Sequence, residues 1–261
     1  MKIKALFHSL ALSVGLLLTA CATSPTGRNQ FIALPDTQVD QMGLQAFNSL
    51  KQQKPLSRNQ RYNQIAQCVA HAITHEVGGG AWEVLVFEDA SPNAFALPGK
   101  KIGVHTGMFS IINSTAQLAA VIGHEVGHVL ARHSNERASQ DMLVKQGMSM
   151  IQQSSMGQNP MTMGMLGLGA KYGVLMPFSR TQESEADMIG LDLMAKAGFD
   201  PRDSIGLWQR MSQAEKGQQP AEFMSTHPAN ETRIAQLQQK MPQALSLFQQ
   251  AQAQGKRPRC G

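Results

Sequence analysis

Apolar residues recur every three or four positions across two stretches in the first third of the chain. Residues 36–53 and 58–77 both follow this spacing, which Ile65 and Val69 illustrate. The spacing aligns apolar side chains on one face of a helix, so we expect a helix in each stretch. The glycines at 78–80 interrupt the pattern and end the second helix.

A different pattern follows these two helices. Residues 82–87 alternate and cluster apolar side chains as a strand does. Residues 93–97 and 101–106 lie on either side of the turn-forming pair Pro98 and Gly99, which indicates a hairpin. We therefore expect a small β-sheet in this part of the chain.

The helix-capping signal Ser-x-x-Gln occurs twice further along the chain. The first begins at Ser114 and opens a long helix that we expect to run to about Arg137. The second begins at Ser179 and opens a helix that closes at Gly198. Together these elements predict an α+β fold that is mainly helical and carries a small sheet.

The segment between these helices is rich in methionine. Eight of the sixteen methionines fall between Met142 and Met176, interleaved with glycines. Methionine adapts to varied apolar partners, and glycine loosens the backbone. Two interpretations of this segment stay open: a pair of methionine-rich core helices, and a flap over a cleft.

The first twenty residues have the features of a secretory signal peptide. Lys2 and Lys4 precede an apolar run at 5–18, which is too short to be a membrane-spanning helix of about 20 residues. The Leu-Thr-Ala-Cys sequence at 18–21 resembles the bacterial lipobox. This resemblance implies cleavage after residue 20 and acylation of Cys21. An uncleaved signal anchor is the alternative.

The lipobox resemblance implies a protein that is anchored to a membrane by lipid. Two or three acyl chains hold a protein on a bilayer, because each buried methylene contributes about 0.8 kcal/mol. Ala22 directly follows the cysteine, and in Gram-negative lipoproteins a residue of this kind at that position resembles the signal for the outer membrane. We therefore expect an outer-membrane anchor that faces the periplasm. Residues 21–35 carry proline and glycine among polar residues, and we expect them to form a tether.

Composition and charge limit what the rest of the chain can be. The proportion of hydrophobic residues, 42%, is ordinary for a globular protein. We expect residues 36–241 to form one domain and the glutamine-rich residues 242–261 to form a flexible tail. Cys68 and Cys260 either pair as a disulfide in the oxidising periplasm or stay separate thiols.

Loss of the two signal-peptide lysines changes the formal charge from +5 to +3, which is 21 basic minus 18 acidic residues. No dense basic run remains in the body of the chain. We therefore expect no binding to nucleic acid.

The strongest chemical signal is the sequence His-Glu-Val-Gly-His at 124–128, which matches the HExxH pattern. A spacing of four places His124 and His128 one turn apart on one helix face, where both can bind one zinc ion. Glu125 lies beside them, where a carboxylate can accept a proton from water. This motif therefore predicts a hydrolytic zinc site.

A catalytic zinc ion needs a third protein ligand and an open position for water. The extended pattern HExxHxxGxxH fails here, because Ala131 and Ser134 stand at its glycine and final histidine positions. Glu183 and Asp187 are four residues apart on a predicted helix, so they share a face. The alternative for these acidic residues is a solvated charged helix face.

The combination of HExxH with a later ExxxD resembles the gluzincin zinc metallopeptidases. Within that group, several segments resemble the HtpX-like and Oma1-like family. The matching segments are 93–96 with Pro98 and Gly99, Ser179 with Arg180, 183–187, and 226–228 with Arg233. The resemblance covers about residues 30–240. When the lipobox is considered as well, the chain resembles most strongly those members of the family that are outer-membrane lipoproteins.

The resemblance implies roles for particular residues. Glu183 would be the third zinc ligand, and Asp187 would orient a zinc-bound histidine, His124. His227 would either stabilise the transition-state oxyanion or act as a fourth ligand, and a histidine packed at a helix entry is the alternative. His105 departs from the family, where an aromatic residue is common, and we expect it to serve packing.

The resemblance also implies a function. It predicts an endopeptidase with one zinc ion per chain that acts on unfolded or misassembled envelope proteins. Outer-membrane assembly proteins or related peptidases would be its partners. A largely latent chaperone or assembly factor that retains the zinc site is the alternative, and a purely structural zinc is a third interpretation.

Overall fold

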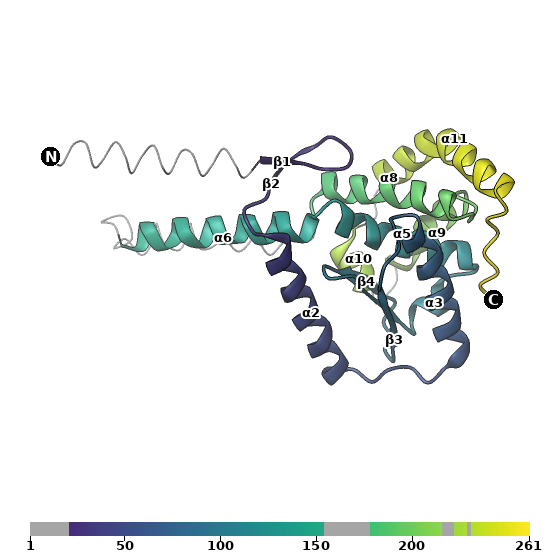
Figure 1. Ribbon diagram of the computed structural model, residues 1–261, viewed down its shortest axis with the longest axis horizontal. Helices are drawn as coiled ribbons and strands as arrows, with labels where there is room; N and C mark the ends of the chain where they lie inside the picture. The colour runs from purple at the N-terminus through teal and green to yellow at the C-terminus, as the bar shows by residue number, and fades with distance from the viewer. Residues whose placement is uncertain (1–20, 154–177, 216–221, 229–230) are drawn as a thin grey trace. The chain divides into compact units, whose positions relative to one another are not determined.

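The computed structural model of the chain is shown in Figure 1. It describes residues 21–153, 178–215, 222–228 and 231–261. The described residues do not include the predicted signal peptide or residues 154–177 of the methionine-rich segment. Both interpretations of that segment therefore concern residues outside the described ranges. By its contacts the chain divides into two compact units.

The larger unit contains residues 37–131 and 177–261. Its helices are α2 (Asp36–Gln53), α3 (Gln60–His75), α4 (Met108–Ile111), α5 (Thr115–Leu130), α8 (Arg180–Lys196), α9 (Asp203–Glu215), α10 (Glu222–Thr226) and α11 (Glu231–Ala253). Its strands are β3 (Glu83–Phe87), β4 (Ala94–Leu97) and β5 (Lys101–His105). The predicted α+β class, mainly helical with a small sheet, is confirmed. None of the helices in the described ranges is both long and apolar enough to cross a membrane.

The sheet of the larger unit has the strand order β3-β5-β4. β5 pairs antiparallel with β4, as the predicted hairpin requires, and parallel with β3. The parallel pairing was not predicted, because the partner of a single strand depends on contacts distant in the sequence. Among the described residues, β4 pairs with one strand only, so its other edge has no strand partner.

α5 is the central helix of the larger unit. Its twelve residues from Gln117 to His128 are all buried. The helix packs against α3, α8, α9 and β4. A helix that is buried on every side carries any polar side chain into the interior, where that side chain needs a partner.

Glycines allow α5 and α8 to lie unusually close together. A β-carbon on Gly190 of α8 would lie 2.6 Å from the backbone nitrogen of His124. A β-carbon on Gly127 of α5 would lie 2.9 Å from the carbonyl oxygen of Ala186. Neither position has room for a side chain, and this close contact brings the HExxH face of α5 next to α8.

α5 ends earlier than the sequence pattern predicts. The pattern favours one helix to about Arg137, but α5 ends at Leu130 and a second helix starts at His133. Between them, Arg132 has a φ of 55°, a left-handed conformation that a right-handed helix cannot continue. The prediction of one continuous helix was therefore wrong.

The smaller unit contains residues 1–36 and 132–176. Its described elements are β1 (Cys21–Thr23), β2 (Asn29–Phe31) and α6 (His133–Gln152). β1 and β2 form an antiparallel hairpin in the segment that was expected to be a tether.

The hairpin of the smaller unit is fastened to α6. Arg28 donates hydrogen bonds of 2.8 and 2.7 Å to the two carboxylate oxygens of Glu136. The hydroxyl of Ser139 accepts from the backbone N–H groups of Ala33 and Leu34. The segment is therefore a structured part of this unit and differs from the loose tether that its composition predicts.

The C-terminal segment also differs from the predicted flexible tail. α11 continues through Pro242 to Ala253, since the glutamine and alanine residues there are good helix formers. Beyond it, Lys256 lies 2.8 Å from both carboxylate oxygens of Glu76. Cys260 and Cys68 form a disulfide, so the first of the two alternatives for these cysteines is the one observed.

Candidate metal centre

α5 supplies three of the predicted site residues. Ser114 caps the helix by accepting from the N–H of Gln117, and the helix then carries His124, Glu125 and His128 into the core. The exposed fraction of each of these three residues is 3% or less. Their burial excludes an ordinary surface role for this motif.

α8 supplies the acidic residues opposite α5. Its capping box is complete, because Ser179 accepts from the backbone of Gln182 and the Gln182 side chain accepts from the backbone of Ser179. This start places Glu183 in the first turn and Asp187 one turn later. Both are buried, at 2% and 3% exposure, so the alternative of a solvated charged face is wrong.

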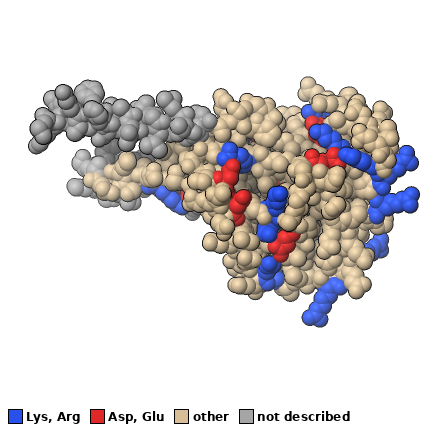
Figure 2. Space-filling view, viewed as in Figure 1, with Lys and Arg blue, Asp and Glu red and all other residues tan. Residues whose placement is uncertain are grey.

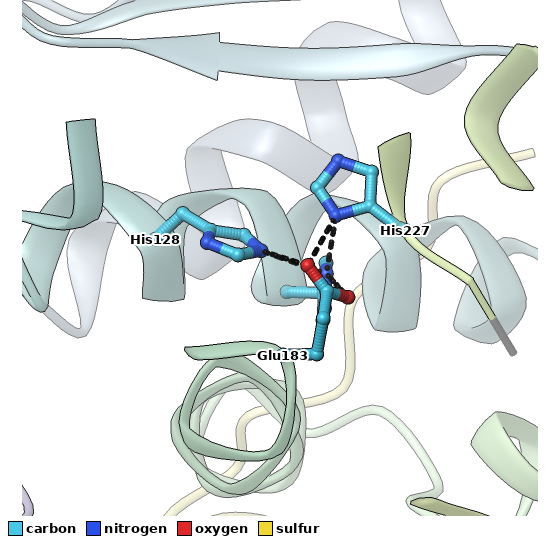
Figure 3. A group of neighbouring side chains, drawn as sticks. His128, Glu183 and His227 are labelled. Carbon is cyan, nitrogen blue, oxygen red and sulfur yellow. Dashed lines mark hydrogen bonds and ion pairs between the residues drawn. The ribbon is translucent and has the colours of Figure 1, made fainter. Parts of the chain in front are cut away.

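Four side chains meet between these helices. The donor atoms of His124, His128, Glu183 and His227 all lie within 4.8 Å of one another. Figure 3 shows His128, Glu183 and His227 pointing toward a common centre. The structure therefore brings together the predicted ligands and adds His227 to them.

The spacing of the donor atoms fits a metal ion. The Nε2 atom of His124 lies 3.0 Å from Nε2 of His128 and 3.2 Å from Nδ1 of His227. Glu183 Oε1 lies 3.0 Å from the His227 nitrogen and 3.4 Å from the His128 nitrogen. Zinc–nitrogen distances of about 2.0–2.1 Å in a tetrahedron put neighbouring donors roughly 3.3 Å apart. Nitrogen and carboxylate donors at this separation suit zinc.

Asp187 fixes the orientation of one of these imidazoles. Its Oδ1 atom lies 2.9 Å from Nδ1 of His124. A carboxylate only accepts hydrogen bonds, so Nδ1 carries a proton and Nε2 is the nitrogen turned toward the other donors. This is the arrangement that the sequence resemblance implies for Asp187.

Arg233 joins the acidic residues to the loop that carries His227. Its guanidinium donates to both oxygens of Asp187, at 2.6 and 2.8 Å, and lies 2.9 Å from Glu183 Oε2. It also donates to the carbonyl oxygens of His227 and Pro228. Arg233 thus holds α8 and the His227 loop in a fixed relation, as a salt-bridge partner.

Aromatic rings surround the donors. The His227 ring stacks against the rings of Phe223 and Phe178, with centroids 4.6 and 5.5 Å apart. Trp208 lies against the Arg233 guanidinium, 4.0 Å from the ring centroid. These three residues could not be found from the sequence, because single aromatic residues in separate segments form no motif.

The pKa directions of the histidines reflect their different neighbours. Burial opposes protonation of His124, but hydrogen bonds to Asp187 and Glu183 outweigh burial and raise its pKa to about 9. Burial lowers the pKa of His128 well below its ordinary value, and the facing imidazoles of His124 and His227 lower it further. A neutral His128 keeps its nitrogen lone pair for a metal ion. Metal uptake at His124 must displace a proton.

The pKa directions of the carboxyl groups also differ. Burial raises the pKa of Glu125. Burial also acts to raise the pKa values of Asp187 and Glu183. Both pKa values are nevertheless lowered, because Arg233 outweighs burial at Asp187 and the hydrogen bonds to the histidines outweigh it at Glu183. Glu125 is therefore the carboxylate of the group most ready to take up a proton.

Charged side chains normally lie at a protein surface. Figure 2 shows the lysine, arginine, aspartate and glutamate side chains on one face of this chain.

Of the other predicted site residues, Cys21 begins β1 in the smaller unit. His105 packs beside the rings of Phe87 and Phe95, with centroids 6.5 and 6.1 Å away, as expected for a packing role.

Comparison with known proteins identifies relatives. A model of Peptidase family M48 matches residues 55–241. The mitochondrial metalloendopeptidase OMA1 of Arabidopsis thaliana is 39% identical over 186 residues, covering 70% of this chain and 37% of that protein. Metalloprotease LoiP of Escherichia coli is 27% identical over 264 residues, covering 92% and 98% of the two chains.

A further relative is the beta-barrel assembly-enhancing protease of Escherichia coli, which is 31% identical over 154 residues, or 55% of this chain and 31% of that protein. The chain spans about a third to a half of the length of the OMA1 relatives that it matches, from 37% to 51% for the first three.

Proposed function

The chain belongs to peptidase family M48, and from this membership we propose that it is a zinc-dependent endopeptidase. The observation that carries the proposal is the buried group of His124, His128, Glu183 and His227, with the Glu125 carboxylate beside it, 3.4 Å from the His227 ring. Zinc is the metal that this family uses and that this donor set suits.

The chain's own residues supply the rest of the chemistry. A bound zinc ion acts as a Lewis acid toward water and a peptide carbonyl group. Glu125 accepts a proton from the attacking water, which its raised pKa favours, and later passes it to the leaving amine. Asp187 and Arg233 keep His124 in one orientation, so the donors need little rearrangement.

An extended peptide is the substrate that this fold suits. An extended peptide can pair with the edge of β4 that has no strand partner among the described residues, and α5 packs against the same strand. Pairing along a strand edge holds a peptide without reading most of its side chains. Unfolded or misassembled proteins expose such extended segments, and the name of one relative, a beta-barrel assembly-enhancing protease, directs the proposal to envelope proteins.

The proposed location is the outer membrane, facing the periplasm. The signal-peptide pattern, the lipobox ending at Cys21 and Ala22 after it support a lipid anchor. Outer-membrane assembly proteins or related peptidases are the proposed partners at that surface.

A second candidate function is a largely latent chaperone or assembly factor. The observation in its favour is His227, whose Nδ1 lies 3.2 Å from the His124 nitrogen and 3.0 Å from Glu183. In this arrangement four protein donors face the centre, whereas a catalytic zinc ion keeps one position open. Activity then requires His227 to withdraw.

One experiment separates the two functions. Purified zinc-loaded protein is incubated with unfolded casein, and cleavage is compared between wild type and Glu125→Gln. We expect the variant to lose about 10²–10⁴-fold in kcat, since the general base is removed. Glu88→Gln, an exposed matched change, should retain activity. Equal cleavage by wild type and Glu125→Gln contradicts the peptidase mechanism, and suppression of aggregation without cleavage supports the chaperone.

A further inference from the structure

The last residues of the chain are held along the surface of the larger unit. The contacts that hold them are Lys256 with Glu76, Pro258 with the backbone of Gly198, and Cys260 with Cys68. Arg257 and Arg259 lie between these contacts, and both side chains are exposed. The fixed segment therefore presents two arginines to solvent.

Two further basic residues lie next to this segment. Arg61 is exposed in the first turn of α3 and lines the same pocket as Gly261. Lys196 is exposed at the end of α8, close in sequence to Gly198, which the segment contacts. We call Arg61, Lys196, Arg257 and Arg259 the basic strip. Figure 2 shows lysine and arginine side chains at the right of the view, where Figure 1 places α3 and the C-terminal segment.

Acidic side chains do not neutralise the basic strip. Within the part of the chain that the structure describes, none of its four side chains forms an ion pair or a hydrogen bond. The neighbouring carboxylates already have partners, which are Lys256 for Glu76, Arg202 for Asp200, and the Ser114 hydroxyl for Asp203. Exposed cations without partners attract an anionic surface that comes within about 8 Å at physiological ionic strength.

A pocket of about 540 Å³ lies beside the basic strip. The rings of Tyr62 and Phe109 stack in its lining with centroids 4.1 Å apart, next to Ile65 and Ile112. Arg61 lines the same pocket. Apolar lining next to a cation suits an amphiphile, which has a hydrocarbon part and a charged head. An acidic peptide offers the charge without the hydrocarbon.

We propose that the basic strip and this pocket bind anionic phospholipid. The arginines bind the phosphate groups, and the pocket takes part of an acyl chain. The proposal rests on the proposed membrane location and extends it, because an anchored protein would meet such headgroups. The disulfide and Glu76 already hold the segment, so little conformational entropy is lost when lipid binds.

Vesicle binding tests the basic strip without the anchor. Residues 21–261, the predicted mature chain, are prepared zinc-loaded with Cys21→Ser, so that no acyl chain holds the protein. We expect binding to vesicles of phosphatidylcholine mixed with phosphatidylglycerol, but not to phosphatidylcholine alone, and weaker binding as salt is added. Each cation at an anionic surface increases affinity by about fivefold, so Arg257→Gln combined with Arg259→Gln should lower it by about 25-fold.

A matched variant controls for net charge. Lys51→Gln combined with Lys145→Gln removes the same charge, but these lysines pair with Glu83 and Asp141. This variant should bind the anionic vesicles nearly as well as the wild type. Equal losses in the two double variants would show that net charge alone attracts the vesicles, and would overturn the basic strip. Failure of the wild type to bind these vesicles would overturn it as well.

Soluble probes test the pocket. Dihexanoylphosphatidylglycerol carries both headgroup and acyl chains, whereas glycerophosphoglycerol is the headgroup alone. We expect the lipid to shift the NMR signals of the Tyr62 and Phe109 rings, and the headgroup to leave them unchanged. Absence of these shifts would overturn the lipid assignment. Polyglutamate that binds as tightly as the anionic vesicles would overturn it too, and would indicate an acidic protein partner.

Failure of the proposed function is visible separately. Glu125→Gln should bind the vesicles as the wild type does, because the basic strip contains no residue of the metal centre. Absence of casein cleavage would refute the peptidase function, and absence of an acyl group on Cys21 in cells would refute the anchor. Neither result changes the binding of phosphatidylglycerol vesicles that the basic strip predicts.

Discussion

Two arginines in different units hold carboxylates with nearly the same geometry. Arg233 in the larger unit bonds both oxygens of Asp187 at 2.6 and 2.8 Å, and Arg28 in the smaller unit bonds both oxygens of Glu136 at 2.8 and 2.7 Å. The surroundings differ: the Arg233 side chain is 2% exposed, and the Arg28 side chain is 23% exposed. Asp187 also contacts His124, which links its pair to the metal donors.

The comparison shows that pair geometry alone does not mark a functional site. The pair in the smaller unit fastens a hairpin to α6, and its partners satisfy one another. The pair in the larger unit is linked through His124 to four buried residues whose ligand atoms lie within 4.8 Å of one another. That convergence of buried donors is what suits the larger unit to bind a metal ion.

The largest predicted effect comes from breaking the buried pair. Arg233→Met should lower the free energy of unfolding by about 3–5 kcal/mol, because Asp187 and Glu183 lose a buried cation. Zinc affinity should fall as well, by about 10–100-fold, since Asp187, which orients His124, loses its own partner. Thermal unfolding and zinc titration measure the two effects.

A control for this variant lies on the surface of the same unit. Arg202 pairs with Asp200, and its side chain is 68% exposed. Arg202→Met should leave both stability and zinc affinity close to their wild-type values, because solvent screens an exposed ion pair. Equal losses in the two variants would contradict the argument that burial makes the difference.

The sequence predicted those parts of the site that depend on local periodicity. A spacing of four set His124 and His128 on one helix face, and Glu183 and Asp187 on another. The family resemblance then implied the roles of the two acidic residues. The particular partners of Arg233 could not be named from the sequence, because they depend on where α11 begins relative to α8.

The parts of the fold that were mistaken have the same cause. The end of α5 depends on a single left-handed residue, Arg132, which apolar periodicity does not register. The hairpin at residues 21–35 depends on Glu136, more than a hundred residues later in the chain. Polar composition in both terminal segments suggested disorder, but distant contacts and a disulfide hold them.

A smaller effect is expected when the link between the pair and the metal donors is weakened. Asp187→Asn removes the charge that Arg233 and His124 share, so zinc affinity should fall by about tenfold or more. The pKa of Asp187 is lowered in the folded chain despite its burial, because Arg233 and His124 favour the ionised form. Its stabilisation is therefore fully present above the unfolded-state pKa of about 3.9, and it is lost as the pH falls from there through the lower pKa of the folded chain.

Because the pKa of Asp187 is lowered, the stability that this residue contributes depends on pH in a measurable way. In metal-free protein, the difference in unfolding free energy between wild type and Asp187→Asn should be greatest near pH 7. It should shrink as the pH falls below about 4, where the Asp187 carboxylate of the unfolded chain takes up a proton while that of the folded chain is still ionised. A difference that grows toward low pH would mean that the pKa of Asp187 is raised, and that its pairing is weaker than the geometry indicates.

The smallest effect is expected at the pair in the smaller unit. Arg28→Met should lower stability by about 1 kcal/mol, because water can reach the arginine and Gln30 still donates to the Glu136 carboxylate at 3.2 Å. Zinc stoichiometry and casein cleavage should stay at wild-type values, since neither Arg28 nor Glu136 belongs to the group of metal-donor residues. Proteolysis within residues 21–35 should become faster, because the hairpin loses its main attachment to α6. A loss of zinc from this variant would show that the smaller unit supports the metal centre, and would remove the distinction between the two arginine pairs.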